Sequence, residues 1–192
     1  ALSINIKVYA DDDLNINAKA SLIVERNTGK IIYESNSNEQ NYPASVTKIL
    51  TAILTIENCK LDDVATVSQS AISHIPEGYV IAPLHVGEQI KIKDLLYALM
   101  LKSANDAAYV LAEHVGKSVE NFSDMMNNKA KELGCKNTHF VNPNGIHNNN
   151  HYTTAYDMYL ISNYAMKNET FAEIVSTYQY TLPATNKHTN IA

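Results

Sequence analysis

A β-hairpin signal near the start of the chain limits the folds that its 192 residues can adopt. Two β-rich runs, 22–24 and 31–33, flank a turn sequence at 27–29 that ends in glycine. A two-stranded hairpin is only marginally stable on its own, so more strands or a helix must cover it. The rest of the chain offers one more candidate strand, at 178–182. We therefore expect the chain to be a fragment of a domain with a larger sheet.

Helical periodicity dominates the remainder of the sequence. After Pro43, which suits a first helical position because it needs no N–H, apolar residues recur at helical spacing in a mostly apolar, buried helix. Residues 60–90 are predicted to form short mixed segments. Two further helices are predicted on either side of the "SAND" stretch, one from about Ile92 to that stretch and one from there to Gly116. A third begins after the capping residue Ser118 and ends at Leu133, just before Gly134. The last two are predicted from Thr153 or Thr154 to about Ala165 and at 171–175.

Composition indicates an ordinary globular domain and excludes some partners. The sequence is 45% hydrophobic, carries a net charge of -5 and contains a single arginine, Arg26. Nucleic-acid recognition depends on basic surfaces rich in arginine, so we expect no nucleic-acid partner. Residues 1–17 are polar and acidic and are predicted to form an N-terminal arm before one domain at 18–192. No apolar run reaches the roughly 18 residues of a membrane span.

Ser45 and Lys48 suggest a nucleophile and its base. Residues three apart on a helix share one face, with about 5–6 Å between their Cβ atoms, so the amine of Lys48 can reach the hydroxyl of Ser45. Burial in an apolar helix lowers a lysine pKa, because desolvation disfavours the charged form. A neutral amine could then accept the proton of Ser45. The first turn of the helix would also favour negative charge developing there.

Neither this motif nor its companion is specific by itself. Chance expects about one Ser-x-x-Lys match in a chain of this composition, and a serine beginning a helix that carries a surface lysine would look the same. Ser103 and Asn105 lie between two predicted helices and could aim polar side chains into a cleft. They could equally be helix-capping residues, since both types are favoured there.

The order and context of these stretches resemble a known family. The runs "PASVTKILTAIL", "DLLYALMLKSANDAAYVLAEHV" and "THFVNPNGIHNNNHYTTAYDM" resemble the serine D-Ala-D-Ala carboxypeptidases, the low-molecular-weight penicillin-binding proteins of the peptidase S11 family. The opening "ASLIVERNTGKIIYESNSNEQNYPAS" is similar to the hairpin that leads into their nucleophile helix. The resemblance extends from about residue 18 to the end of the chain.

The resemblance implies an α/β fold of the β-lactamase/transpeptidase type, with an antiparallel sheet and a helical subdomain. It further implies an acyl-enzyme mechanism without a cofactor, in which Ser45 is the nucleophile, Lys48 the base and Ser103 a proton relay. Asn105 would be a substrate-binding residue that hydrogen-bonds the substrate amide, or it would stabilise Lys48. The implied substrate is the D-Ala-D-Ala end of a peptidoglycan stem peptide, and the implied inhibitors are β-lactams. Such an enzyme acts outside the cytoplasm, either secreted or associated with the cell envelope.

Two departures from the family pattern bear on activity. Ala104 stands where the family usually has glycine, which we expect to be tolerated unless its φ is positive. The family's Lys-Thr-Gly strand has no match, since the single Thr-Gly pair, Thr28-Gly29, lies in the hairpin turn. We therefore expect the C-terminal strands of the sheet, with one oxyanion donor, to be missing from this chain. The chain should turn over its substrate weakly or not at all. It could self-associate, and it could belong to a protein whose membrane anchor lies outside this sequence.

Other functions remain open on these grounds. A class A-type β-lactamase shares Ser-x-x-Lys but needs a deacylating glutamate that the sequence does not identify. A non-catalytic peptidoglycan-binding or sporulation protein could retain the fold.

His139, His147 and His151 lack the spacing of a zinc-ligand pair, so we expect no metal site there. His114 lies near a predicted helix end that favours a partly charged imidazole. Cys59 and Cys135 could pair or stay free.

Overall fold

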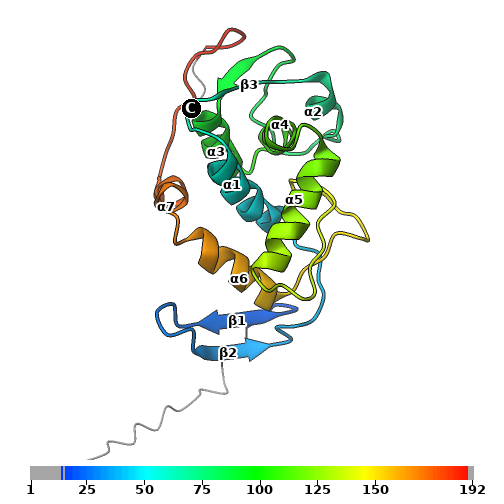
Figure 1. Ribbon diagram of the computed structural model, residues 1–192, viewed down its shortest axis with the longest axis vertical. Helices are drawn as coiled ribbons and strands as arrows, with labels where there is room; N and C mark the ends of the chain where they lie inside the picture. Colours follow the sequence, from blue (N-terminus) through cyan, green and yellow to red (C-terminus); the bar gives the residue numbers. More distant parts are fainter. Residues whose placement is uncertain (1–13, 15, 190–192) are drawn as a thin grey trace, which may run out of the picture.

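The structure is a computed structural model that describes residue 14 and residues 16–189. Most of the predicted N-terminal arm, 1–17, therefore lies outside the described residues. A bundle of helices fills the centre of the molecule, and two small antiparallel sheets lie at its opposite ends (Figure 1). This arrangement confirms the predicted α/β class with antiparallel strands. In the described part of the chain, no helix is both long and apolar enough to cross a membrane.

The predicted hairpin is confirmed. Strands β1 (Ser21–Val24) and β2 (Ile31–Ser35) pair antiparallel, with Ile23 opposite Tyr33 and an irregularity beside Val24. Gly29 has φ +70°, the left-handed conformation that glycine adopts without a steric penalty. The hairpin packs beside helix α6 (Ala155–Ala165), so a helix and not a wider sheet covers it in the described residues (Figure 1).

Helix α1 (Thr47–Asn58) runs through the centre of the helical bundle (Figure 1). Leu50, Ala52 and Ile53 are fully buried, as the apolar pattern predicted. Around α1 pack α3 (Ile92–Leu101), α4 (Asn105–Gly116), α5 (Val119–Glu132), α6 and α7 (Glu169–Ser176). Since both ends of α1 are held by this shell, side chains at either end occupy fixed positions.

The predicted helix boundaries rest on local hydrogen bonds that the structure contains. Ser118 accepts a hydrogen bond from Asn121 N at the start of α5, and Thr154 accepts one from Asp157 N at the start of α6. Gly134 follows α5 with φ +87° and donates its N–H to the Lys131 carbonyl. These caps satisfy backbone groups that a helix end leaves without partners.

Two expectations for the strands were incomplete or wrong. The segment 60–90 contains a second sheet, β3 (Val64–Thr66) with β4 (Gln89–Lys91), and a short helix α2 (Gln69–Ser73). Residues 178–182 do not form a strand of either sheet. Tyr180 there stacks on Tyr97 of α3 at 3.8 Å between ring centroids.

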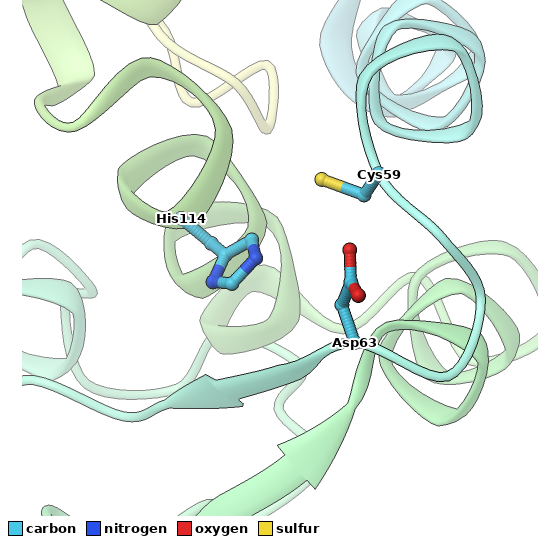
Figure 2. A group of neighbouring side chains, drawn as sticks. All are labelled: Cys59, Asp63 and His114. Carbon is cyan, nitrogen blue, oxygen red and sulfur yellow. The ribbon is translucent and has the colours of Figure 1, made fainter.

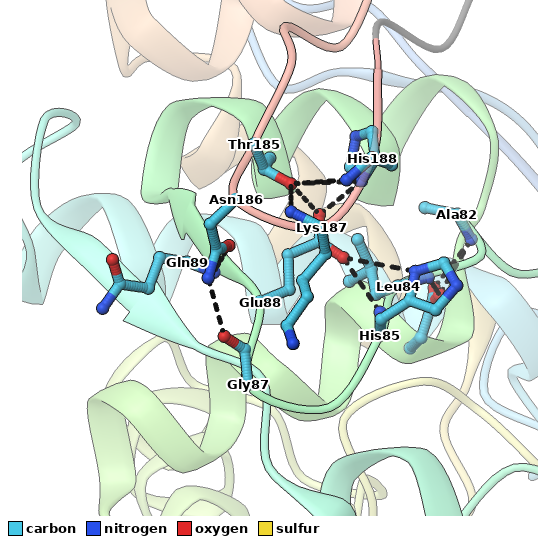
Figure 3. Close-up of polar contacts among 11 residues, drawn as sticks. Ala82, Leu84, His85, Gly87, Glu88, Gln89, Thr185, Asn186, Lys187 and His188 are labelled. Atoms are coloured by element: carbon cyan, nitrogen blue, oxygen red, sulfur yellow. Dashed lines mark hydrogen bonds and ion pairs between the residues drawn. The ribbon is translucent and has the colours of Figure 1, made fainter.

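The segment at 185–188 is fixed against the second sheet by a buried carboxylate (Figure 3). Glu88 is fully buried and accepts hydrogen bonds from the Thr185 hydroxyl, at 2.9 Å, and from His85 N, at 2.9 Å. His188 Nδ1 lies 2.6 Å from the same carboxylate. Asn186 adds a bond from its side chain to the Gly87 carbonyl. The start of β4 thus holds a segment almost a hundred residues away in the sequence.

Candidate active site

Ser45 lies in a 3-10 turn, Ala44–Val46, that leads directly into α1. The sequence predicted it in the first turn of the α-helix, but that helix begins only at Thr47. Ala44 has φ 49°, an unusual conformation for a residue with a Cβ, of the kind that clusters at functional sites. The Ser45 side chain is exposed. The turn therefore presents the hydroxyl to solvent at the N-terminal end of α1.

Lys48 lies directly beside this hydroxyl. Its side chain is 2% exposed, and Nζ is 3.1 Å from Ser45 Oγ, 3.0 Å from Asn105 Oδ1 and 2.9 Å from the Asn144 carbonyl oxygen. No carboxylate forms an ion pair with this amine among the described residues. Burial consequently lowers the pKa of Lys48 to about 8. Such an amine has an appreciable neutral fraction near neutral pH.

Asn105 holds Lys48 and a neighbouring loop at once. Its Oδ1 accepts from Lys48 Nζ and, at 3.0 Å, from Asn144 Nδ2. Its Nδ2 and its backbone N–H both donate to the Val80 carbonyl, at 2.9 and 3.0 Å. Ala104 has φ -60°, so alanine fits at this position as expected. Both polar ends of the Asn105 side chain are thus engaged within the protein.

Ser103 is less closely integrated. It occupies the turn between α3 and α4, is partly exposed and has φ 59°. Among the described residues, no hydrogen bond joins its hydroxyl to Ser45 or Lys48. The structure therefore brings together Ser45, Lys48 and Asn105 of the four predicted site residues. The role of Ser103 stays a prediction.

The loop at 142–146 is a part of the site that the sequence did not reveal. Asn144 and Gly145 are predicted as a turn and nothing more, but Asn144 is 1% exposed and bonds Lys48 and Asn105. Gly145 has φ +88°, and a Cβ there would lie 1.8 Å from the Ala44 carbonyl oxygen. Only a glycine allows the loop to approach the Ser45 turn so closely. The Pro-Asn-Gly sequence signalled the turn, but nothing local signalled its partner.

His151 supports the same turn from within the protein. It is 1% exposed, its Nδ1 accepts from Val141 N, and its Nε2 is 2.9 Å from Thr47 Oγ1. Because Nδ1 accepts, the proton of the neutral ring resides on Nε2 and is donated to Thr47. Burial lowers the pKa of His151 to about 4, so the ring stays neutral near pH 7. It acts here as a packed, hydrogen-bonded residue.

Comparison with known proteins assigns the chain that carries this site to a family. The sequence profile of the peptidase S11 family, described as D-alanyl-D-alanine carboxypeptidase, matches residues 7–192. The chain belongs to the peptidase S11 family. It is 39% identical over 167 residues to D-alanyl-D-alanine carboxypeptidase DacF of Bacillus subtilis, an alignment that covers 84% of this chain and 42% of that protein. This family assignment agrees with the resemblance noted in the sequence.

Solved structures show the same fold. The chain is similar to the crystal structure of the Streptomyces K15 DD-transpeptidase, with a TM-score of 0.80 and 35% identity, covering 85% of this chain and 66% of that one. It is also similar to DacD of Francisella tularensis, with a TM-score of 0.77 and 34% identity, covering 84% of this chain and 39% of that one. This S11 chain therefore spans less than half the length of the Bacillus and Francisella relatives.

Proposed function

We propose that the protein is a serine D-Ala-D-Ala carboxypeptidase in which Ser45 is the nucleophile and Lys48 its general base. The observation that carries this proposal is the 3.1 Å contact between a buried amine and an exposed hydroxyl. A pKa of about 8 makes the amine a usable proton acceptor at physiological pH. Membership of the S11 family supplies the reaction class.

Acylation would proceed as a balanced transfer at one carbonyl. Neutral Lys48 takes the hydroxyl proton of Ser45 while Oγ attacks the carbonyl carbon of the penultimate D-alanine. The backbone N–H of Ser45 stabilises the resulting oxyanion. The C–N bond then breaks, and the proton passes from Lys48, relayed by Ser103, to the amine of the departing D-alanine. Water next attacks the ester carbonyl while Lys48 accepts a proton from that water. The bond between the acyl carbon and Ser45 Oγ then breaks, Lys48 returns the proton to Oγ, and the shortened peptide leaves as its carboxylic acid.

The asparagines and the loop at 142–146 would organise this chemistry. Asn105 and the Asn144 carbonyl offer Lys48 only neutral acceptors, so they fix the amine without the large rise in pKa that a carboxylate would cause. We also propose that Asn105 binds the substrate amide after exchanging one of its present partners. The predicted extent of the catalytic domain, 18–192 and continuing beyond it, belongs to this proposal.

The substrate class follows from the same reasoning. We propose that the site accepts stem peptides ending in D-Ala-D-Ala and that β-lactams acylate it durably. Since peptidoglycan lies outside the cytoplasm, we place the activity there.

Several apolar side chains are exposed, including Ile32 of the hairpin at 53% and Tyr178 at 99%, and these would favour self-association of the isolated chain.

Penicillin labelling tests this function. The protein in its full natural length is incubated with a fluorescent penicillin and analysed by intact mass. We expect one covalent adduct on the wild type and on Ser176→Ala, an exposed serine of α7, and none on Ser45→Ala. Rapid penicillin hydrolysis without a lasting adduct would indicate a β-lactamase. Binding to cell-wall fragments without any acylation would indicate a non-catalytic member of the fold.

A further inference from the structure

Three side chains that commonly bind metals converge at the end of α1 opposite the Ser45 turn. Cys59 follows the last residue of α1, Asp63 precedes β3, and His114 lies in the last turn of α4. One ligand atom from each residue lies within 4.8 Å of the other two. Figure 2 shows the thiol, the carboxylate and the imidazole pointing toward a common space between their elements.

The ligand atoms are not already engaged with one another. Within the described residues, the Cys59 sulfur and both ring nitrogens of His114 lack a hydrogen-bond partner, and Asp63 and His114 do not form an ion pair. One oxygen of Asp63 accepts a 2.9 Å hydrogen bond from Lys60 N, which fixes the carboxylate and leaves its other oxygen free. A ligand carboxylate oriented by such a bond is typical of metal sites.

We propose that Cys59, Asp63 and His114 form a zinc site. Thiolate, imidazole and carboxylate are the usual ligands of Zn²⁺, with bonds of about 2.0–2.3 Å. In a tetrahedral site this places the ligand atoms about 3.3–3.6 Å apart. Side-chain movements of about 1 Å therefore close the present arrangement around an ion with these bond lengths. All three residues are only partly buried, so solvent can supply a water molecule as the fourth ligand.

The charges of the site balance on binding. Zn²⁺ displaces the thiol proton of Cys59 to solvent, and the thiolate and the Asp63 carboxylate then neutralise the ion. Burial, aided by the positive charge of Lys117, lowers the pKa of His114. This corrects the expectation from the sequence of a partly charged imidazole at this helix end. The amine of Lys117 donates to the His114 carbonyl and so leaves the imidazole itself available.

A second group of ligand types does not support a metal in the same way. His188 Nδ1 is 2.6 Å from the Glu88 carboxylate, a hydrogen-bond distance that is too short for two ligands of one ion (Figure 3). Glu88 is also engaged by Thr185 and by His85 N. That carboxylate is satisfied without a cation, unlike the open group at Cys59.

The zinc site would act as a clamp. It joins the short loop between α1 and β3, which carries Cys59 and Asp63, to His114 in the last turn of α4. Cys59 lies eleven residues beyond Lys48, or about 16 Å along the helix axis. We therefore expect the ion to stabilise the fold without taking part in the chemistry at Ser45.

Cobalt and zinc titrations test the proposal on the full-length protein. The protein is stripped with a chelator, kept reduced and titrated with Co²⁺, whose thiolate charge-transfer and visible bands report a tetrahedral sulfur-containing site. We expect one Co²⁺ per chain, displaced by Zn²⁺. At zinc about 100-fold above its dissociation constant, the melting temperature should rise by about 5–10 °C.

Matched variants separate this site from nonspecific binding. Cys59→Ser should abolish the charge-transfer band and weaken binding by about 100-fold or more, while Cys135→Ser, which removes the other thiol, should leave both unchanged. Asp63→Asn, which keeps both thiols, should weaken binding by about 10-fold or more. Penicillin labelling of each variant verifies its fold. The proposal fails if the wild type shows no thiolate band, if folded Cys59→Ser retains it, or if folded Cys135→Ser loses it.

Discussion

Lys48 Nζ lies 3.1 Å from Ser45 Oγ while the lysine side chain is only 2% exposed. The amine is therefore dehydrated but has three oxygen neighbours, none of them charged. This combination lowers its pKa and directs its lone pair, once the amine is neutral, toward the serine proton. The same relationship leads to separate expectations for the base, its protonation, its neighbour and the turn that holds the serine.

Removing the amine should suppress acylation. Lys48→Ala takes away the proposed base, and positioned bases contribute about 10²–10⁴ in rate, so the second-order rate of penicillin acylation should fall by that factor. Lys131→Ala, which removes an exposed lysine of α5, should acylate at the wild-type rate. Stopped-flow fluorescence measures both. An unchanged rate in folded Lys48→Ala would show that another group accepts the proton.

Acylation should depend on pH through the same group. Because the base must be neutral, the rate should rise as pH increases and level off above about pH 8, where Lys48 has lost its proton. The His151 pKa of about 4 lies well below this range, so the ring should add no inflection near neutral pH. A pH profile of the acylation rate measures the inflection. A rate that falls as the pH approaches 8 would contradict the assignment.

A carboxylate placed beside the amine should move that inflection. Asn105→Asp retains an oxygen near Lys48 Nζ, where the present contact is 3.0 Å, but adds a negative charge that raises the lysine pKa. We expect slower acylation near neutral pH that partly recovers at higher pH, with some loss of stability because the side-chain hydrogen bond to the Val80 carbonyl is lost. Asn121→Asp, an exposed change on α5, should leave the profile in place. A profile unmoved by Asn105→Asp would argue against the contact.

The glycine at the edge of the site should be irreplaceable for geometric reasons. Gly145→Ala must displace the Ala44 carbonyl, since the new Cβ would lie 1.8 Å from its oxygen, and it also adopts an unfavourable φ of +88°. We expect a loss of about 1–3 kcal/mol of stability together with a large fall in acylation rate.

Gly134→Ala is a matched control for this change. It has almost the same φ, +87°, but no atom lies within 4 Å of a new Cβ. It should lose stability through backbone strain alone and should acylate normally. Thermal unfolding and acylation rates, measured in parallel, separate strain from the steric contact. Equal acylation by the two variants would show that the 142–146 loop does not position Ser45.

Features with local causes could be predicted from the amino-acid sequence. The hairpin followed from its turn, the helices from their periodicity, and the starts of α5 and α6 from capping residues that bond atoms three positions away. Ser45 and Lys48 are three residues apart, so their spacing allows the pairing without making it specific. The resemblance of the surrounding stretches to the S11 family then made that pairing specific.

Which distant segments complete these features became known only from the folded structure. Asn144 is 96 residues from Lys48, and its turn sequence carried no sign of that contact. Residues 178–182 have a strand-like sequence but join neither sheet, and Tyr180 stacks on Tyr97 of α3, because strand pairing requires a partner that local sequence does not specify. Cys59 and Asp63 share one loop, and His114 likewise meets them only because α4 packs beside that loop. Local propensities fix short elements, whereas packing of the whole chain fixes which side chains become neighbours.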